Sequence, residues 1–335
     1  MAVAPSKRPV KTGRPERSQK HRQPAPAGAG QLCVLEHQAN QRLDNYLAGR
    51  LKGAPKTLIY RIIRTGEVRI NGKRAKADSR VQPGDLVRVP PLRLGEQAGP
   101  PAPGQQLTSL LKASVLLEDA DFLVINKPAG LAVHAGSGSK LGLIEALRQI
   151  FPQWPGLELV HRLDKGTSGC LLLAKTGKAR KALMQAFRDQ QVRKTYHAIV
   201  VGQWPSRAKR VDVALLRQPE RSGQRRVEID EEGKEAVTEF SIAESLRGAT
   251  LVEARPLTGR THQIRVHAAW VGCELLGDDK YASRDQEALR QRAGHKRLFL
   301  HAGSLAFPHP SSGLPVLVQA PYDTAFDGAL RKLRG

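Results

Sequence analysis

HRLDKGTSG, residues 161–169, runs directly into the apolar segment CLLLA at residues 170–174 and is the most informative stretch of the chain. The apolar segment predicts a short buried strand, and the polar loop before it lies at the edge of that strand. The loop carries one carboxylate, Asp164, between Arg162 and Lys165, and nearby positive charge favours the ionised carboxylate. An accessible ionised Asp can act as a nucleophile or base. An isolated loop Asp is more commonly part of a local salt bridge, so both interpretations stay open from these residues alone.

The pattern HRLDxxTSG resembles the signature of the RluA family of pseudouridine synthases and matches it at every motif position. These enzymes isomerise uridine in RNA, and the resemblance implies that Asp164 is the essential catalytic residue. It also implies that Arg162 fills the gap left in the RNA when the target uridine is flipped into the pocket. The alternative for Arg162 is a contact to phosphate.

Two further phrases resemble the same family. In KTYHA, residues 194–198, the resemblance implies that Tyr196 lies against the target base and assists proton removal at C5 of uracil. A strand Tyr is otherwise most often a core aromatic. In GRTHQIRVH, residues 259–267, the resemblance implies that Arg265 pairs with Asp164 and keeps it ionised and oriented. Thr261 is the expected N-cap of the helix that carries Arg265.

The phrase KPAGLAVH, residues 127–134, resembles another motif of the family, and its Pro and Gly predict a turn. We expect no catalytic group in this phrase, but Lys127 and Lys165 are expected to contact phosphate. The histidines match no standard zinc spacing, so structural roles and no metal are expected for them. The sequence contains no glycine-rich nucleotide-binding motif, so no cofactor is expected.

The N-terminal part resembles the S4 RNA-binding domain in the phrases RLDNYL, GEVRINGK and VQPGDLVRV. Apolar residues at helical spacing predict two short helices, from about residue 43 to 51 and from 55 to 66. An Asn71-Gly72 pair predicts a tight hairpin turn. Three basic residues of the second helix are expected to bind RNA phosphates, with solvent-facing charge as the alternative: Lys56, Arg61 and Arg64.

These patterns predict an α+β protein. Residues 31–90 are expected to form a small S4-like domain of two helices and a few strands. Residues 113–330 are expected to form a catalytic domain with a mixed, mostly antiparallel sheet flanked by helices. Residues 1–30 predict a disordered basic arm, and residues 91–112, rich in Pro, Gly and Gln, predict a linker.

The 335 residues include 54 Lys and Arg against 31 Asp and Glu, and this formal net charge of +23 predicts a polyanionic partner. Nucleic acid and an anionic membrane both satisfy the charge, but no apolar run reaches membrane-spanning length, so no membrane contact is expected. The three widely spaced cysteines predict reduced thiols in a cytoplasmic protein. No protein partner is indicated, and a monomer is the default expectation.

The resemblance implies that the substrate is 23S rRNA of the large ribosomal subunit. Pseudouridine forms when the N1–C1′ bond breaks, the uracil rotates and C5 bonds to C1′, which needs neither metal nor cofactor. Asp164 could attack C1′, add to C6 or remove the C2′ proton, and the sequence leaves these routes open. The alternatives are a synthase acting on another RNA such as tRNA, a non-enzymatic S4-type RNA-binding factor, and a glycoside hydrolase. A hydrolase is disfavoured because it usually needs a pair of carboxyl groups.

Overall fold

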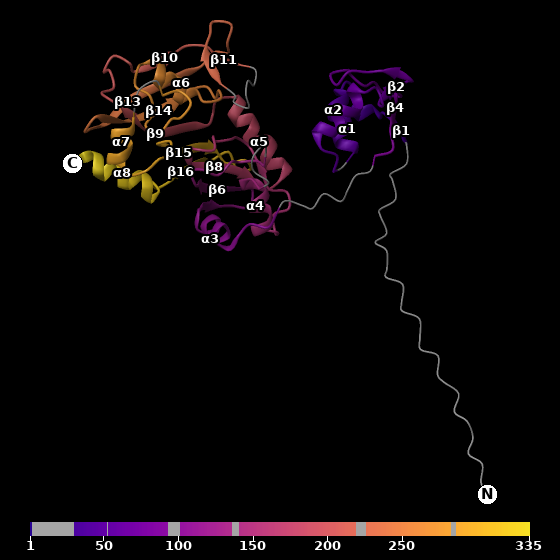
Figure 1. Cartoon of the computed structure of the whole chain (residues 1–335), viewed down its shortest axis with the longest axis horizontal. Coiled ribbons are helices and arrows are strands. Elements are labelled where there is room, and N and C mark those ends of the chain that lie inside the picture. The colour runs from indigo at the N-terminus through magenta and orange to yellow at the C-terminus, as the bar shows by residue number, and fades with distance from the viewer. Residues whose placement is uncertain (2–29, 52, 93–100, 136–140, 219–225, 283–285) are drawn as a thin grey trace. The chain divides into compact units, whose positions relative to one another are not determined.

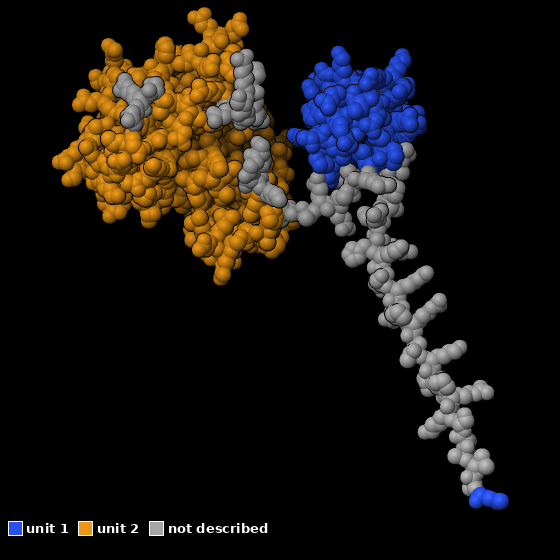
Figure 2. All heavy atoms as spheres, in the orientation of Figure 1, with its two compact units in different colours: residues 1–99 blue, residues 100–335 orange. Residues whose placement is uncertain are grey.

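The computed structural model describes residues 1, 30–51, 53–92, 101–135, 141–218, 226–282 and 286–335. The chain forms two compact units, Met1–Gly99 and Pro100–Gly335, which Figure 2 shows in blue and orange. Nearly all of the expected basic arm, residues 2–29, lies outside the described residues, as do residues 93–100 of the expected linker.

The N-terminal unit combines two short helices with a small antiparallel sheet. The helices are α1 (Leu43–Arg50) and α2 (Lys56–Arg64), and a 3-10 turn, η1 (Glu36–Gln38), precedes them. The described strands pair in the order β1 (Gly30–Cys33), β4 (Leu86–Val89), β2 (Arg69–Ile70) and β3 (Lys73–Arg74).

The local sequence explains these elements. Asn71 and Gly72, with φ angles of 49° and 77°, form the tight turn between β2 and β3, since both central positions of such a hairpin turn need positive φ. The helical stripes bury their apolar residues against β4, and the core includes Leu43, Tyr46, Leu47, Ile59, Ile62, Ile63 and Val87. The two predicted helices and the predicted hairpin are therefore confirmed.

The C-terminal unit is built on one large mixed sheet (Figure 1). Its strands pair in the order β10-β13-β14-β9-β15-β8-β6-β5, with β16 beside β15 and β7 beside β8. The described strands are β5 (Val115–Glu118), β6 (Phe122–Lys127), β7 (Glu158–Leu159), β8 (Ser168–Ala174), β9 (Arg193–Val201), β10 (Arg210–Asp212), β13 (Val237–Leu246), β14 (Ala249–Pro256), β15 (Leu300–Pro308) and β16 (Pro315–Gln319). A separate hairpin joins β11 (Leu215–Arg217) to β12 (Val227–Ile229).

The parallel pair β8–β15 joins the two halves of this sheet, whose other pairs among the described strands are antiparallel. Gly169 permits this junction. Its φ is +106°, and a Cβ there would lie 2.2 Å from the carbonyl oxygen of Ala302. Only glycine allows the two backbones to approach so closely, and this contact holds the C-terminal end of the HRLDKGTSG loop.

Helices cover the sheet in three apolar clusters. Leu111 of α3 (Gln105–Ala113), Leu147 of α4 (Leu143–Ile150) and Leu183 of α5 (Gly177–Arg188) pack with β6 and β8. A second cluster packs α6 (Gln263–Trp270) with β9 and β14. The third contains α7 (Glu287–Ala293) and α8 (Thr324–Arg334). The α+β fold with a mixed, mostly antiparallel sheet is confirmed.

The C-terminal boundary predicted for the linker, residue 112, is wrong. Residues 105–113 form the helix α3 instead. Leu107 and Leu111, one helical turn apart, contact the core of the C-terminal unit, and this burial outweighs the loop-like composition of the preceding residues. None of the described helices is both long and apolar enough to cross a membrane.

Candidate active site

Asp164 lies in the loop between β7 and β8, and this loop is fastened by backbone contacts. The carbonyl of Asp164 accepts the amide N–H of Thr167 at 3.1 Å, and the carbonyl of Lys165 accepts that of Gly130 at 2.8 Å. The carboxylate itself remains partly exposed, at 22% of its side chain. The loop therefore holds the backbone in place and leaves the carboxylate open to a ligand.

Lys127 also fastens the Asp164 loop, and its predicted contact with phosphate is wrong. Its side chain is fully buried at the end of β6, and Nζ donates to the carbonyls of Pro128, Leu131 and Lys165 at 2.8, 2.8 and 3.2 Å. Burial lowers the pKa of Lys127 to about 7, although the charge of Asp164 opposes this shift. The sequence singled out Lys127 as a cation of this motif, but only the tertiary packing shows that its side chain points into the protein.

Arg265 projects from α6 toward Asp164. Its Nη1 lies 3.7 Å from Oδ2 of Asp164, while Nε and Nη2 donate to the two carboxylate oxygens of Asp278 at 2.7 and 2.6 Å. Burial opposes the charge of Arg265, but the hydrogen bonds and charge of Asp278, with the charge of Asp164, raise its pKa. The guanidinium is thus fixed by Asp278 and presents its remaining edge to Asp164.

Within the described residues, Asp164 forms an ion pair with Arg265 and lies close to His262, rather than pairing with its sequence neighbours Arg162 and Lys165. Arg162 and Lys165 are both exposed. Neither flanking cation therefore forms the local salt bridge with Asp164 that their sequence positions allowed, although Arg162 and Asp164 line the same cavity.

His262 approaches the same carboxylate oxygen as Arg265, with Nε2 3.8 Å from Oδ2 of Asp164. It occupies the left-handed region at φ 55°, which is uncommon for a residue other than glycine and occurs often at functional sites. Its Nδ1 lies 2.6 Å from the hydroxyl of Tyr281. Burial lowers the pKa of His262 to about 4 against the opposing charge of Asp164, so the imidazole is neutral at pH 7.

The predicted N-cap of α6 is wrong, because His262 rather than Thr261 precedes the first helical residue. The side chain of Gln263 organises this end of the helix. Its Oε1 accepts from the backbone N–H of Arg260 and the hydroxyl of Thr258, and its Nε2 donates to the carbonyl of Val237. These contacts make the tight turn that places His262 beside the carboxylate.

Tyr196 and Lys194 project from β9 into the same space. Burial raises the pKa of the Tyr196 phenol, and the negative charge of Asp164 raises it further. The phenol therefore stays protonated and offers an aromatic surface, not a phenolate base. Burial lowers the pKa of Lys194 to about 8, and its Nζ donates to the carbonyl of Thr258 at 3.2 Å.

These groups surround one cavity of about 300 Å³, at the small end of the usual range for ligand pockets. Among the described residues that line the cavity, Asp164 is the only carboxylate. The cations that line it are Arg162, Lys194, Arg260 and Arg265. The wall is completed by Phe187, on which His161 is stacked with ring centroids 5.0 Å apart. A single carboxylate among several cations and aromatic rings suits one nucleotide with its phosphate.

The structure therefore brings Asp164, Arg162, Tyr196 and Arg265 together in one cavity. The sequence reasoning missed Asp278 and Tyr281 and gave His262 only a structural role. Asp278 and Tyr281 lie together in the phrase GDDKY, residues 277–281, just after the helix of the Arg265 motif. A carboxylate and a phenol in a turn carry no local signal of function, so only the fold reveals their contacts.

The other predicted RNA-binding residues lie in the N-terminal unit. Lys56, Arg61 and Arg64 are exposed on α2 and line one groove with Arg74 and Lys76. Tyr60 also lines the groove, and its hydroxyl donates to the carboxylate of Asp44 at 2.9 Å. The helix α2 thus presents its positive charges beside Tyr60, which is 48% exposed.

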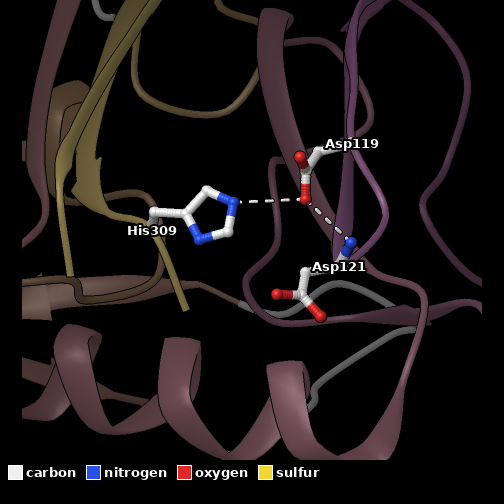
Figure 3. Close-up of side chains that lie close together, drawn as sticks. All are labelled: Asp119, Asp121 and His309. Carbon is white, nitrogen blue, oxygen red and sulfur yellow. Dashed lines mark hydrogen bonds and ion pairs between the residues drawn. The ribbon is translucent and has the colours of Figure 1, made fainter. Parts of the chain in front are cut away.

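Asp119, Asp121 and His309 lie close enough together to hold a cation (Figure 3). Nδ1 of His309 accepts the backbone N–H groups of Ser311 and Ser312 at 3.2 and 3.3 Å. Nε2 therefore carries a proton and faces Oδ1 of Asp119 at 3.3 Å. This ring has no lone pair free for a metal, so we assign the cluster a structural role between two turns.

Comparisons with known proteins identify the class. The profile of the RNA pseudouridylate synthase family matches residues 121–270, which contain the loop of Asp164 and the helix of Arg265. The profile of the S4 domain matches residues 41–87. Since relatives with nearly half of their residues identical cover most of its length, the chain belongs to the RNA pseudouridylate synthase family. The protein is an RNA pseudouridine synthase, which removes the hydrolase and the non-enzymatic binding factor as alternatives.

Two sequence relatives match over at least 90% of both chains. Ribosomal large subunit pseudouridine synthase C of Pasteurella multocida (strain Pm70) is 47% identical over 304 residues, covering 90% of this chain and 93% of the relative. The protein of the same name from Escherichia coli (strain K12) is 44% identical over 306 residues, covering 90% and 96%. Among solved structures, Human RNA Pseudouridylate Synthase Domain Containing 4 has a TM-score of 0.57 and 29% identity, covering 68% of this chain and 96% of its own.

Proposed function

We propose that this synthase isomerises specific uridines of 23S rRNA, with Asp164 as its catalytic carboxylate. The observation that carries the proposal is the position of Asp164, which is partly exposed in a basic cavity of nucleotide size and paired with an anchored arginine. The rRNA substrate is supported by the relatives named ribosomal large subunit pseudouridine synthase C. Such a substrate fits the cytoplasmic location expected from the sequence.

Each predicted residue receives one role in this proposal. The flipped uridine enters the cavity with Asp164 next to the bond that breaks. Arg265 pairs with the carboxylate from 3.7 Å and orients it, and the ring of Tyr196 packs on the base. Arg162 is exposed at the cavity wall, where it can fill the gap in the RNA or contact a phosphate.

The groove of the N-terminal unit provides a second RNA contact in this proposal. Its exposed cations, Lys56, Arg61 and Arg64 with Arg74 and Lys76, can track a phosphate backbone. Replacing both Arg61 and Arg64 by Ala is expected to weaken binding to 23S rRNA and to reduce the slope of log affinity against log salt by about 2, since each lost phosphate contact removes about one unit. Arg88→Ala, at an exposed position of β4 in the same unit, is the matched control.

The enzyme and its substrate are tested by pseudouridine mapping on 23S rRNA from a deletion strain. Sites lost on deletion are expected to return with the wild-type protein but not with Asp164→Asn. Restoration of every site by this variant would remove Asp164 from the chemistry. If 23S rRNA never changed, the same mapping on tRNA and on other rRNA would test the remaining candidate, a synthase for another RNA.

A further inference from the structure

His262 has a feature that the proposed function leaves unused, namely a ring nitrogen facing the cavity beside Asp164. His262 lines the cavity, and its Nε2 lies 3.8 Å from Oδ2 of the carboxylate. This separation is too long for a direct hydrogen bond. It leaves room for an acceptor atom of a ligand that touches both groups.

The tautomer of His262 follows from its neighbours. The backbone N–H of Val227, in β12, donates to the hydroxyl oxygen of Tyr281 at 3.1 Å, so that oxygen is already used as an acceptor. Within the described part of the chain, the phenolic proton then has one acceptor in reach, Nδ1 of His262 at 2.6 Å. A neutral imidazole that accepts at Nδ1 carries its proton on Nε2. The N–H of His262 therefore points into the cavity.

The orientation of Tyr281 is fixed as well. Its backbone N–H donates to Oδ1 of Asp278 at 3.2 Å, and its ring lies 5.1 Å from the guanidinium carbon of Arg265. The rings of His262 and Tyr281 meet edge to face, with centroids 5.5 Å apart. The turn that anchors Arg265 thus also sets the direction of the imidazole.

We propose that His262 is a catalytic residue whose Nε2–H donates a hydrogen bond to a carbonyl oxygen of the flipped uracil, with Tyr281 as the positioning residue that sets its tautomer. This inference rests on the proposed function of the cavity. In each route open to Asp164, negative charge develops on the uracil carbonyl oxygens. When the N1–C1′ bond breaks, its electron pair stays on the uracil ring. When a carboxylate adds to C6, the electron pair of the C5=C6 double bond shifts and the negative charge develops on O4.

A neutral donor suits this task. A preorganised N–H aimed at a developing negative charge stabilises the transition state more than the ground state, and the proton stays on nitrogen throughout. A charged imidazolium would instead pair with Asp164 and reduce its reactivity. Burial keeps the pKa of His262 low, which is consistent with this role.

The first test compares two substitutions that differ in reach. His262→Asn accepts the left-handed backbone as readily as His, but its amide ends near the position of Nδ1. His262→Gln is less suited to that backbone, but its amide extends to the position of Nε2. The probe is a 23S rRNA transcript, with single-turnover rate and RNA affinity measured separately.

The rate of His262→Asn is expected to fall by about 10²–10³-fold with unchanged RNA affinity. His262→Gln is expected to recover at least about tenfold of that loss, since it restores a donor. A purely structural role of His262 predicts the opposite order, with Asn better than Gln, and that order would overturn the proposal. Wild-type rates for both variants would also overturn it.

The second test asks whether the acceptor is the base or Asp164. Transcripts containing 2-thiouridine or 4-thiouridine replace one carbonyl oxygen by sulfur, which is a weaker acceptor. One of the two replacements is expected to slow the wild-type enzyme several-fold more than His262→Asn. Equal effects on both enzymes for both analogues would show that His262 acts on the carboxylate, contrary to the proposal.

Tyr281→Phe tests the positioning role through a signal other than rate. In ¹⁵N spectra of the imidazoles, wild-type His262 is expected to be the Nε2–H tautomer, and the variant a mixture of both tautomers. An unchanged spectrum would remove Tyr281 from the proposal. A wild-type enzyme that is inactive on the 23S transcript would instead fault the proposed substrate, so the two failures are distinguishable.

Discussion

Arg265 and Asp278 form a buried bidentate ion pair, and through it Asp278 sets the direction in which Arg265 faces Asp164. The two hydrogen bonds are 2.7 and 2.6 Å long, and Asp278 is only 1% exposed. Asp278 also accepts the backbone N–H groups of Lys280 and Tyr281. One carboxylate therefore organises both the arginine and the turn behind the cavity.

Asp278→Asn is expected to destabilise the protein and to lower its single-turnover rate. Removing one charge of a buried pair typically costs about 3–5 kcal/mol, because the remaining charge is left uncompensated. Urea unfolding measures the stability. The control is Asp279→Asn, since the neighbouring Asp279 side chain is 85% exposed and its pair with Arg290 is expected to contribute less than about 1 kcal/mol. Equal losses in the two variants would contradict the anchoring role.

Lys127→Met is expected to lower both stability and rate while leaving RNA affinity intact. The methionine has a similar length but removes the hydrogen bonds that Nζ donates to three carbonyls, at a cost of about 1–3 kcal/mol. Lys165→Met is the matched control, because the Asp164 loop uses only the backbone carbonyl of Lys165 and its side chain is exposed. The control is expected to keep its stability and to lose some affinity for RNA. If Lys127→Met lost RNA affinity at unchanged stability, the result would instead support the contact between Lys127 and phosphate that the sequence predicted.

Gly169→Ala is expected to destabilise the C-terminal unit by about 2–5 kcal/mol, from backbone strain and from the clash with β15. The added Cβ would lie 2.2 Å from the oxygen of Ala302, and φ is +106°. Gly177→Ala, at the start of α5 with open space around its Cα, is expected to change stability by less than about 1 kcal/mol. Thermal unfolding of both variants is the measurement, and a tolerated Gly169→Ala would show that the β8–β15 junction can relax.

His267 predicts a loss of stability in acid. Burial lowers the pKa of this fully buried imidazole to about 4, against a usual 6.5, and its Nδ1 lies 2.9 Å from the hydroxyl of Thr238. As the pH falls, His267 takes up its proton in the unfolded chain before it does so in the folded protein. The contribution of the neutral His267 to the free energy of unfolding is therefore complete above pH 6.5 and is lost toward pH 4.

Urea midpoints across this window measure the effect of His267. One such group contributes a slope of up to about 1.4 kcal/mol per pH unit. His267→Asn, whose amide can take the place of Nδ1 beside Thr238, is expected to flatten the slope. An identical pH dependence in the variant would assign the acid loss to other groups.

Several features of this protein follow from its sequence alone. The Asn71-Gly72 hairpin and the helix stripes of α1 and α2 are confirmed, and Thr176 caps α5 by accepting the N–H of Ala179. Each of these is encoded within a few consecutive residues, where turn chemistry, capping and periodicity act directly. The motifs around Asp164 and Arg265 identified the family for the same reason, since they are contiguous phrases.

The tertiary structure alone decided the contacts between those phrases. It turned Lys127 inward, brought Asp164 beside Arg265 and His262 instead of pairing it with Arg162 and Lys165, and placed Asp278 and Tyr281 behind the cavity. It also made residues 105–113 a helix, because Leu111 reaches a distant core. Burial and ion pairing depend on residues far apart in the chain, and a sequence pattern does not specify which of several nearby charges a fold will bring within reach.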